Sequence, residues 1–356
     1  MPILTNLSFA PTQPTGWLSY SVNLLKELKN LDIEVLSPID ISGIKCHQLP
    51  PDMTTDFGMK GHLKRLLWTQ FELPNLYRQM KSTLLFCPIP EAPLFSSCSY
   101  VVTVHDLIPL RFPQWFSITQ RLYCSYYIRA VIRQSKHVIC DSMATAEDLR
   151  KFLGVTEDKI TMIPLAYNSE KFRFLDLPTQ NYFLYLGRHN PHKNPERLIT
   201  AFATLPNRQD YELWLAGPSD RRYTPVLKAQ VEKLGITHQV KFLDYIPDSE
   251  LPKIINQAIA LVFPSLWEGF GLPVLEAMAC GTPVITSNLS SLPEVAGDAA
   301  ILINPYNTGE ITEAMQAIAT DLGLRSRLSS QGIIHSQQFS WEKTGKATVE
   351  VLSRYL

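Results

Sequence analysis

The sequence predicts an α/β protein with two domains, each built on a parallel β-sheet. Short apolar runs rich in β-branched residues alternate with longer segments whose apolar residues recur at helical spacing. This pattern is typical of parallel sheets covered by helices on both faces. The chain has 356 residues, more than the roughly 250–300 that one hydrophobic core serves. The periodic pattern lapses between Ala166 and Asn181, which predicts a domain boundary near residue 178.

Nine short apolar runs are predicted strands because turn-forming residues bound them. They are Ile33–Leu36, Tyr100–Val104, His137–Cys140, Ile160–Ile163, Tyr182–Leu186, Tyr211–Leu215, Val240–Leu243, Ile259–Phe263 and Pro283–Thr286. The last segment of the chain begins with Ser340, a favourable helix N-cap, and carries apolar residues at helical spacing. It therefore predicts a closing helix.

The composition excludes several classes of protein. The hydrophobic fraction is 45%, and 33 Lys and Arg residues balance 33 Asp and Glu residues, so neither a disordered chain nor a nucleic-acid-binding protein is indicated. The six cysteines form no C-x-x-C pair, and we expect reduced thiols and no metal site. Neither a signal peptide nor an apolar run of about 18 residues is found. We expect a cytoplasmic protein, and leave attachment to a membrane surface and the oligomeric state open.

One candidate site lies in the segment from Ile259 to Cys280, which predicts a strand, a loop and a helix. The loop follows the carboxyl end of a strand and leads to a helix N-terminus, where free amides and the helix dipole favour anions. Gly269 and Gly271 permit close approach of a ligand. We place Glu276 in the first helical turn, so that it and Glu268 face one crevice. The alternative is a dipole-complementing Glu276 and a solvated Glu268.

A second strand, loop and helix precede the first. The strand Tyr182–Leu186 ends at Gly187, and Asn194 with the Pro and Glu that follow it has the pattern of a helix N-cap and first turn. Arg188 and Lys193 flank this turn. A guanidinium and an ammonium beside a helix N-terminus neutralise a diphosphate without a metal. The alternative is a pair of exposed loop cations, but the placement of both favours phosphate binding.

The first half of the chain contains two weaker candidates. His105, followed by Asp106, ends the strand Tyr100–Val104, and a histidine there points toward the ligand crevice of an α/β domain. The alternative is a structural histidine bonded to a backbone carbonyl. Gly16 follows the apolar run Ile3–Asn6 and precedes a predicted helix, so it is a candidate for phosphate approach. No G-x-G-x-x-G or Walker sequence occurs.

Together these segments resemble the family-4 (group 1) retaining glycosyltransferases. That family has the GT-B architecture, in which two Rossmann-like domains face each other across an active-site cleft. The shared motifs are the E-x7-E pair Glu268 and Glu276, Gly187-Arg188, His192-Lys193-Asn194, Phe263-Pro264-Ser265, Gly281-Thr-Pro-Val284 and Phe339-Ser-Trp341. The segment from His105 to Leu110 resembles the branch that includes bacterial O-antigen mannosyltransferases.

The resemblance implies an acceptor-side domain at 1–177, a donor domain at 178–338, and a helix at 339–356 that packs back on the first domain. It implies that Glu276 binds the donor ribose, and that Glu268 binds the sugar. The donor phosphates would be bound by Arg188 and Lys193, next to Gly187, and by the backbone of Gly269, Phe270, Gly271 and Leu272. His105 would contact the transferred sugar, and Gly16 would line the phosphate side of the first domain. Ile246, in the turn Tyr245–Pro247, would contact the base. Many relatives have paired glycines where this chain has Thr15-Gly16.

The resemblance also implies a reaction. A hexosyl group, mannosyl or glucosyl, would pass from a UDP- or GDP-sugar to a hydroxyl of a glycan or lipid-linked acceptor in cell-surface polysaccharide synthesis. Configuration would be retained by front-face substitution, without a metal or another cofactor, and the leaving phosphate would help to deprotonate the acceptor. Two alternatives stay open: an epimerase or phosphorylase on the same scaffold, and a non-catalytic sugar-binding subunit.

The acceptor is expected to meet first-domain loops such as Gln48–Phe71, whose composition suggests mobility. Basic and aromatic residues recur there at helical spacing: Lys60, His62, Lys64, Arg65, Trp68 and Phe71. A basic amphipathic helix suits an anionic lipid surface. A solvated surface helix is the alternative that we favour from the sequence.

Overall fold

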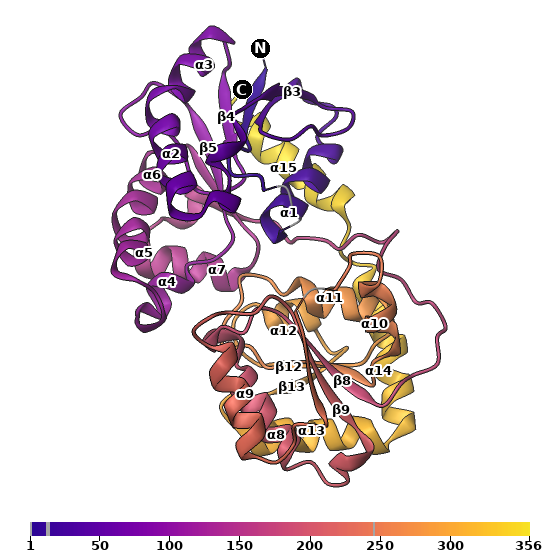
Figure 1. Ribbon diagram of the computed structural model, residues 1–356. Helices are drawn as coiled ribbons and strands as arrows, with labels where there is room; N and C mark the ends of the chain where they lie inside the picture. The colour runs from indigo at the N-terminus through magenta and orange to yellow at the C-terminus, as the bar shows by residue number, and fades with distance from the viewer. Residues whose placement is uncertain (1, 12–14, 245) are drawn as a thin grey trace. The chain divides into compact units, whose positions relative to one another are not determined.

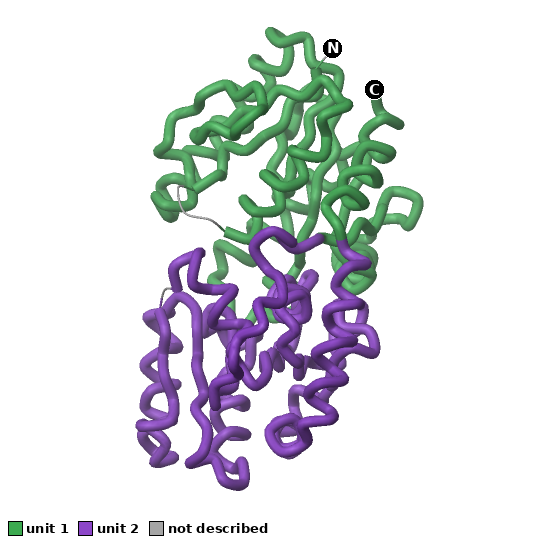
Figure 2. Tube along the Cα trace, turned by 90° about the vertical axis from the view of Figure 1, so that its right-hand side faces the viewer, with its two compact units in different colours: residues 1–165, 340–356 green, residues 166–339 purple. Residues whose placement is uncertain are grey.

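The computed structural model describes residues 2–11, 15–244 and 246–356, and it divides into two compact units. Unit 1 comprises Met1–Leu165 and Ser340–Leu356, and unit 2 comprises Ala166–Phe339 (Figures 1 and 2). Each unit contains one parallel sheet, as the α/β pattern predicts. The first boundary therefore lies earlier than 177/178, and the last segment begins at Ser340 rather than at residue 339.

The segment between the predicted and the observed boundary belongs to unit 2 because polar contacts hold it there. The Leu175 amide donates a hydrogen bond to Asn256 Oδ1 at 2.8 Å, and Asn256 Nδ2 donates to the Arg173 carbonyl at 3.0 Å. Lys171 forms an ion pair with Asp248. Polar contacts of this kind cannot be predicted from the spacing of apolar residues.

Unit 1 is built on a seven-stranded parallel sheet in the order β3-β2-β1-β4-β5-β6-β7. The strands are β1 (Ile3–Asn6), β2 (Ile33–Ser37), β3 (Lys45–Gln48), β4 (Leu84–Cys87), β5 (Tyr100–Val104), β6 (His137–Cys140) and β7 (Ile160–Met162). The sheet order reverses between β1 and β4, which are hydrogen-bonded neighbours. In a parallel sheet such a reversal opens a crevice at the carboxyl ends of the two strands.

The helices of unit 1 include one that is distant in sequence. They are α1 (Gly16–Glu27), α2 (Gly58–Phe71), α3 (Leu73–Gln79), α4 (Ile108–Arg111), α5 (Ile118–Leu122), the π-helix η4 (Tyr123–Ile128), α6 (Arg129–Gln134), α7 (Met143–Asp148), the π-helix η5 (Leu149–Leu153) and α15 (Trp341–Ser353). α15 packs beside α1 (Figure 1). The Ser340 side chain caps α15 as predicted, by accepting from the Lys343 amide at 3.3 Å.

Two short 3₁₀ turns and α2 occupy the segment for which the composition suggests a mobile loop. The turns are η1 (Pro51–Met53) and η2 (Thr55–Phe57). α2 turns Gly61, Arg65 and Thr69 inward, where all three are buried. The segment is therefore an ordered part of unit 1.

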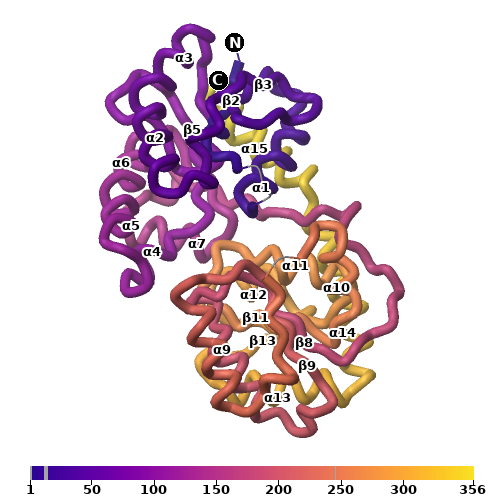
Figure 3. The backbone as a smooth tube through the Cα atoms, in the orientation of Figure 1, coloured from indigo at the N-terminus to yellow at the C-terminus, as the bar shows by residue number. Residues whose placement is uncertain are grey.

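Unit 2 is built on a six-stranded parallel sheet in the order β10-β9-β8-β11-β12-β13. The strands are β8 (Tyr182–Leu186), β9 (Glu212–Ala216), β10 (Val240–Leu243), β11 (Ala260–Phe263), β12 (Val284–Ser287) and β13 (Ile301–Ile303). The helices are α8 (Pro195–Ala203), α9 (Thr224–Lys233), α10 (Leu251–Gln257), α11 (Leu272–Ala279), α12 (Leu292–Ala296), α13 (Thr308–Thr320) and α14 (Leu322–Ser336). Figure 3 shows α8, α9 and α13 on one side of the sheet and α10, α11 and α14 on the other.

The six cysteines all lie in the described part of the chain, and none is paired in a disulfide. Four are buried and two are half-buried. None of the described helices is both long enough and apolar enough to cross a lipid bilayer.

Candidate functional site

The candidate site of unit 2 lies where the order of its sheet reverses. β8 and β11 are parallel neighbours, and from them the chain progresses to opposite edges of the sheet. The loops after β8 and β11 therefore emerge side by side at the carboxyl edge, the place where α/β sheets bind ligands. These loops contain the two charged segments singled out from the sequence.

Lys193 and Glu268 are brought together across these two loops. Lys193 Nζ lies 2.7 Å from each carboxylate oxygen of Glu268. The two side chains are only 19% and 10% exposed, and the ammonium lies 5.2 Å from the centre of the Phe263 ring. Screening by water is weak at such a position, so the pair interacts more strongly than a surface ion pair. A solvated Glu268 is therefore excluded.

Asn194 connects three loops of the site through its side chain. It is buried and adopts a left-handed conformation with φ 62°. Its Nδ2 donates to the Pro264 carbonyl at 3.0 Å and to the Pro305 carbonyl at 2.8 Å. Asn194 is the N-cap residue of α8, as predicted, but its side chain makes no capping bond. The amide instead fixes the Lys193 turn against the loop that carries Glu268.

Burial also sets the charge of His192, which precedes the lysine. Burial and the adjacent Lys193 ammonium lower the pKa of His192 to about 4, while Glu268 opposes the shift. His192 is therefore neutral at neutral pH. The positive charge of this turn comes from Lys193 and from Arg188.

Two serines, Ser290 and Ser291, hold the loop from Glu268 to Leu272 in place through hydrogen bonds. The Glu268 amide donates to Ser290 Oγ at 3.1 Å, and Ser291 Oγ donates to the Glu268 and Phe270 carbonyls. Among the described residues, none accepts a hydrogen bond from the amides of Phe270 and Leu272. Free amides at the start of α11 are available to an anion.

Gly271 is required here by its conformation and its surroundings. Its φ is 123°, a value that residues with a side chain rarely adopt, and an added Cβ would lie 2.8 Å from Leu292 Cδ2. Gly269 is half-buried. The Phe270 side chain is buried in an edge-to-face contact with Phe339, with ring centroids 6.0 Å apart. Only the backbone of Phe270 is left for a ligand.

Glu276 lies in the second turn of α11, not in the first, because the helix already begins at Leu272. It is half-buried. Burial raises the pKa of Glu276 to about 8, Lys171 acts against this rise and Asp248 adds to it. A protonated carboxyl both donates and accepts hydrogen bonds, which matches a pair of vicinal hydroxyls. Dipole complementation in the first turn is excluded as its role.

Gly187 and Arg188 lie directly after β8. Gly187 has φ 154°, and Tyr185 Oη donates to the Arg188 carbonyl at 2.8 Å. The Arg188 side chain is exposed, and no described carboxylate pairs with it. The neighbouring Gly217 packs directly on Gly187, since a Cβ at Gly217 would lie 2.1 Å from the Gly187 carbonyl oxygen. The backbone here is therefore tightly constrained and the guanidinium is available.

The predicted base-binding turn follows β10. Ile246 is half-buried and outside regular structure, whereas Tyr245 lies outside the described residues. The role of Ile246 stays a prediction.

The candidate residues of unit 1 form a separate, enclosed cluster. His105 Nδ1 lies 2.6 Å from Asp141 Oδ2, and His105 Nε2 lies 3.0 Å from the Pro88 carbonyl oxygen. A carbonyl only accepts, so Nε2 carries a proton that it donates to Pro88. His105 and Asp141 are 9% and 2% exposed.

Asp141 favours the protonated form of His105. Burial lowers the pKa of His105, but the Asp141 carboxylate, with smaller contributions from Asp106 and the Pro88 carbonyl, more than offsets this, and the pKa is raised. The ring lies beside Trp17 and Tyr20, with centroids 6.5 and 4.8 Å away. Both ring nitrogens are used within unit 1, as in the structural alternative, so contact of His105 with a sugar stays a prediction.

Gly16 is the first residue of α1 rather than part of the preceding loop. Thr15 is the N-cap, and its Oγ1 accepts from the Leu18 amide at 3.3 Å. Among the described residues, apart from Gly16, its two chain neighbours and the backbone of its own helix, no atom lies within 4 Å of the place where a Gly16 Cβ would be. Residues 12–14 of the preceding loop lie outside the described part. The departure at Thr15 is thus a helix cap, and the space at Gly16 is open.

The structure adds site residues that the sequence patterns did not single out. Asn194, Ser290 and Ser291 hold the donor loops together, and Asp141 holds His105. Ser290 and Ser291 follow β12, and Asp141 follows β6. Polar residues that follow predicted strands within about five positions are therefore an available signal. The sequence predicts the N-cap position of Asn194 but not its bonds to the Pro264 and Pro305 carbonyls.

The chain matches two family models that together span most of its length. Residues 168–335 match the model described as glycosyl transferases group 1, and residues 19–171 match the model described as glycosyltransferase family 4. The first match covers the loops with Lys193, Glu268 and Glu276. The second covers His105 and Asp141.

Two curated relatives and one solved structure are similar to this chain. O-antigen chain mannosyltransferase B of Escherichia coli is 30% identical over 262 residues, 70% of this chain and 68% of that protein. O-antigen chain mannosyltransferase RfbU of Salmonella typhimurium is 27% identical over 314 residues, 85% and 87% of the two chains. The crystal structure of Alr3699/HepE of Anabaena with UDP and glucose covers 99% of this chain and 100% of its own, with 20% identity and a TM-score of 0.78. The structural likeness confirms the predicted GT-B fold.

Proposed function

The chain belongs to the group 1, family-4 glycosyltransferases, and on this premise we propose that it transfers a mannosyl or another hexosyl group from a nucleoside-diphosphate sugar to a hydroxyl of a glycan or lipid-linked acceptor. We propose cell-surface polysaccharide synthesis as the process, since two similar proteins are named O-antigen chain mannosyltransferases.

The pair of Lys193 and Glu268 is the observation that carries this proposal. An ammonium group and a carboxylate lie side by side at the point where the strand order of the sheet reverses, next to free amides of α11. The carboxylate can accept hydrogen bonds from the hydroxyls of a sugar. A diphosphate needs positive partners and a sugar needs oxygen acceptors, and both are present within one hydrogen-bonded pair. A donor would exchange contacts with this pair rather than meet isolated charges.

The proposed mechanism assigns charge stabilisation to unit 2. Breaking the bond between the anomeric carbon and the diphosphate moves negative charge onto the leaving phosphate, where Lys193, the exposed Arg188 and the amides at the start of α11 stabilise it. We propose retention by front-face substitution, without a metal, with the leaving phosphate taking the acceptor proton. Glu268 is engaged by Lys193 and orients the sugar. Glu276 binds the ribose hydroxyls as a neutral carboxyl.

The proposed location is the cytoplasmic side of a membrane, with the protein attached peripherally. A lipid-linked acceptor would be presented there, and a nucleotide-sugar donor is made in the cytoplasm.

Thermal denaturation with a panel of UDP- and GDP-sugars tests the donor site. A ligand that binds the native state stabilises it by about 2.7 kcal/mol at a concentration 100-fold above its Kd, and Tm rises in consequence. We expect a shift with one nucleotide class, and no shift in Lys193→Ala. Absence of a shift with every nucleotide would overturn the donor assignment.

Product analysis separates the proposed transferase from its alternatives. We expect sugar transfer to an acceptor that continues in EDTA. Conversion of the donor sugar without an acceptor would instead identify an epimerase, and phosphorolysis with a lysine-bound pyridoxal group would identify a phosphorylase. Nucleotide binding without any turnover on a panel of acceptors would favour a non-catalytic subunit.

A further inference from the structure

An apolar stripe runs along the solvent face of α2. Met59, Leu63, Leu67 and Phe71 recur every four residues and are 69%, 58%, 52% and 68% exposed. Residues four apart lie on one side of a helix. Large apolar side chains in a continuous row on a soluble surface mark an interaction site.

The stripe is not needed to hold α2 in place. The opposite face of the helix packs inward through Gly61, Arg65 and Thr69. Arg65 is buried and forms a two-point ion pair with Glu91, with Nε 2.6 Å from Oε2 and Nη2 3.0 Å from Oε1. Arg65, which the sequence pattern grouped with the surface residues, is thus internal, and the exposed face of α2 carries the four apolar residues together with Lys60 and Lys64.

A second apolar stripe lies on helices next to α2. Ile118, Leu122 and Tyr126, on α5 and η4, are 65%, 49% and 71% exposed and also recur every four residues. η4 packs along α2. The His62 and Tyr123 rings lie 4.9 Å apart, and Gln70 Nε2 donates to Tyr127 Oη at 3.3 Å. The two stripes therefore belong to adjoining helices of one surface.

The charged residues within the helices of this surface are cations. Neither the segment 57–71 nor the segment 107–140 contains an Asp or Glu, whereas both contain Lys and Arg. The exposed Asp56 and Glu72 adjoin the two ends of α2, and Lys64 pairs with Asp52. Lys60 on α2 is exposed, and Arg121 lies on α5, between the residues of the second stripe. The surface therefore presents Lys60 and Arg121 beside its apolar stripes.

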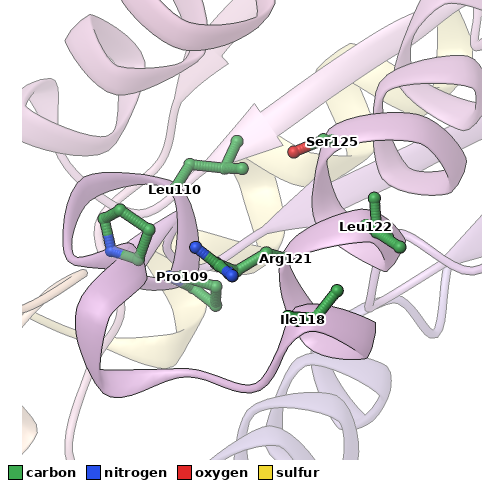
Figure 4. Close-up of a pocket in the computed structure, with 7 residues that line it drawn as sticks. Pro109, Leu110, Ile118, Arg121, Leu122 and Ser125 are labelled. Carbon is green, nitrogen blue, oxygen red and sulfur yellow. The ribbon is translucent and has the colours of Figure 1, made fainter.

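Arg121 lies in a hollow beside the second stripe. The hollow has a volume of ≈ 300 Å³ and is lined by Pro109, Leu110, Pro113, Ile118, Arg121, Leu122 and Ser125. Figure 4 shows the Arg121 guanidinium among apolar side chains of α4 and α5. No described residue accepts a hydrogen bond from its Nε. A guanidinium with apolar walls fits a phosphate that carries an acyl or prenyl chain.

We propose that α2, α5 and η4 form the surface by which this protein docks on a bilayer of anionic lipids. The two apolar stripes enter the boundary between headgroups and chains, while Lys60 and Arg121 meet lipid phosphates, a combination that strengthens binding through both area and charge.

This inference rests on the proposed function in one respect: the surface would hold the proposed transferase at the membrane. Vesicle binding is measured without donor or acceptor, so its failure would leave nucleotide binding and transfer untouched. Loss of donor binding would equally leave this surface intact. The two proposals therefore fail separately.

Co-sedimentation with vesicles tests the surface directly. The full chain is mixed with vesicles of phosphatidylcholine alone or with about one third phosphatidylglycerol, at low and high salt. We expect binding to the anionic vesicles that weakens as salt rises. The double variant Leu63→Glu with Leu67→Glu should bind at least about tenfold less, because both apolar burial and charge attraction are removed.

The matched control carries the same change on unit 2. Val226 and Ile334 are 59% and 66% exposed, so Val226→Glu with Ile334→Glu alters net charge and exposed apolar area in the same way. This control should bind vesicles like the unaltered chain. All variants change exposed residues and should keep the same Tm.

Any of three results would overturn the proposal. The first is that the unaltered chain does not sediment with anionic vesicles. The second is that both double variants lose binding equally, and the third is that light scattering shows a dimer that dissociates only in the α2 variant. The last result would assign the surface to self-association.

Arg121→Gln sharpens the test, since it should weaken binding to anionic vesicles and leave the weak binding to phosphatidylcholine unchanged.

Discussion

The two units have the same kind of sheet and opposite kinds of chemistry at its carboxyl edge. In unit 2, Lys193 and Glu268 meet across two loops beside amides that no described residue uses. In unit 1, both ring nitrogens of His105 are engaged, one by Asp141 and the other by the Pro88 carbonyl. A shared fold therefore does not give shared function. Unit 2 presents charge to a ligand, whereas unit 1 uses charge to fix its own loops.

Removing the lysine of unit 2 should have the largest effect. Lys193→Ala deletes a charge partner of the leaving phosphate and leaves Glu268 unpaired, so kcat/KM for transfer should fall about 10²–10³-fold. Lys241→Ala is the control, because Lys241 pairs with Glu212 in the same unit at a partly exposed site, 2.7 Å apart. The control should change kcat/KM less than about twofold. Equal losses in both variants, or full activity in Lys193→Ala, would refute the site.

Alanine in place of glycine should destabilise unit 2 at Gly217 much more than unit 1 at Gly16. Gly217→Ala places a Cβ 2.1 Å from the Gly187 carbonyl oxygen at φ 147°, and should lower the free energy of unfolding of unit 2 by about 3 kcal/mol. Gly16→Ala meets open space at the start of α1 and should change stability by less than about 1 kcal/mol. Thermal melts of both variants check this. Tolerance of alanine at Gly217 would contradict the close packing of the two glycines.

Asp141 should make unit 1 sensitive to pH. Because the pKa of His105 is raised in the folded state, its stabilisation is complete below the unfolded value of about 6.5 and is lost as pH rises through the folded value. Asp141→Asn should therefore lower Tm more at pH 6 than at pH 9. Asp106→Asn, which removes a weaker influence on the same ring, should show a smaller difference. A loss that is independent of pH would show that Asp141 acts only by packing.

Glu276 should give the smallest effect, and here too stability falls as pH rises. Its pKa is raised to about 8, so between the unfolded value of about 4.3 and pH 8 the folded state holds the extra proton and stability falls as pH rises. The Tm advantage of Glu276→Gln over the unaltered chain should grow across this window and level off above it. Nucleotide binding should change little in Glu276→Gln and weaken about tenfold in Glu276→Ala. Equal binding by both variants would remove Glu276 from the ribose.

Much of the fold is predictable because buried parallel strands are continuous apolar runs. Tyr100–Val104, His137–Cys140, Tyr182–Leu186 and Val240–Leu243 have the predicted bounds. β3 was missed because Lys45–Gln48 is a polar, partly exposed edge strand. β4 and β13 were missed because short apolar runs do not distinguish a strand from a buried helix segment.

The candidate site was predictable at the level of loops and not of contacts. Strand order and loop position place Lys193 near Glu268, but their direct pairing depends on how two loops fold, and Asn194 and Ser290 control that folding. The link from His105 to Asp141 spans 36 positions and exists because β5 and β6 are adjacent. Register between strands is not written in the local pattern of either one.

The closing helix has a consequence for how the chain is made. α15 lies beyond all of unit 2 in sequence, yet it packs on α1 and donates from Thr344 Oγ1 to the Pro164 carbonyl at 2.8 Å. During synthesis, unit 2 therefore leaves the ribosome whole, while most of unit 1 has already emerged and still lacks one of its helices. The first-made half of the molecule is thus the last to be completed, and until then the surface of α1 that α15 covers is exposed to chaperones and proteases.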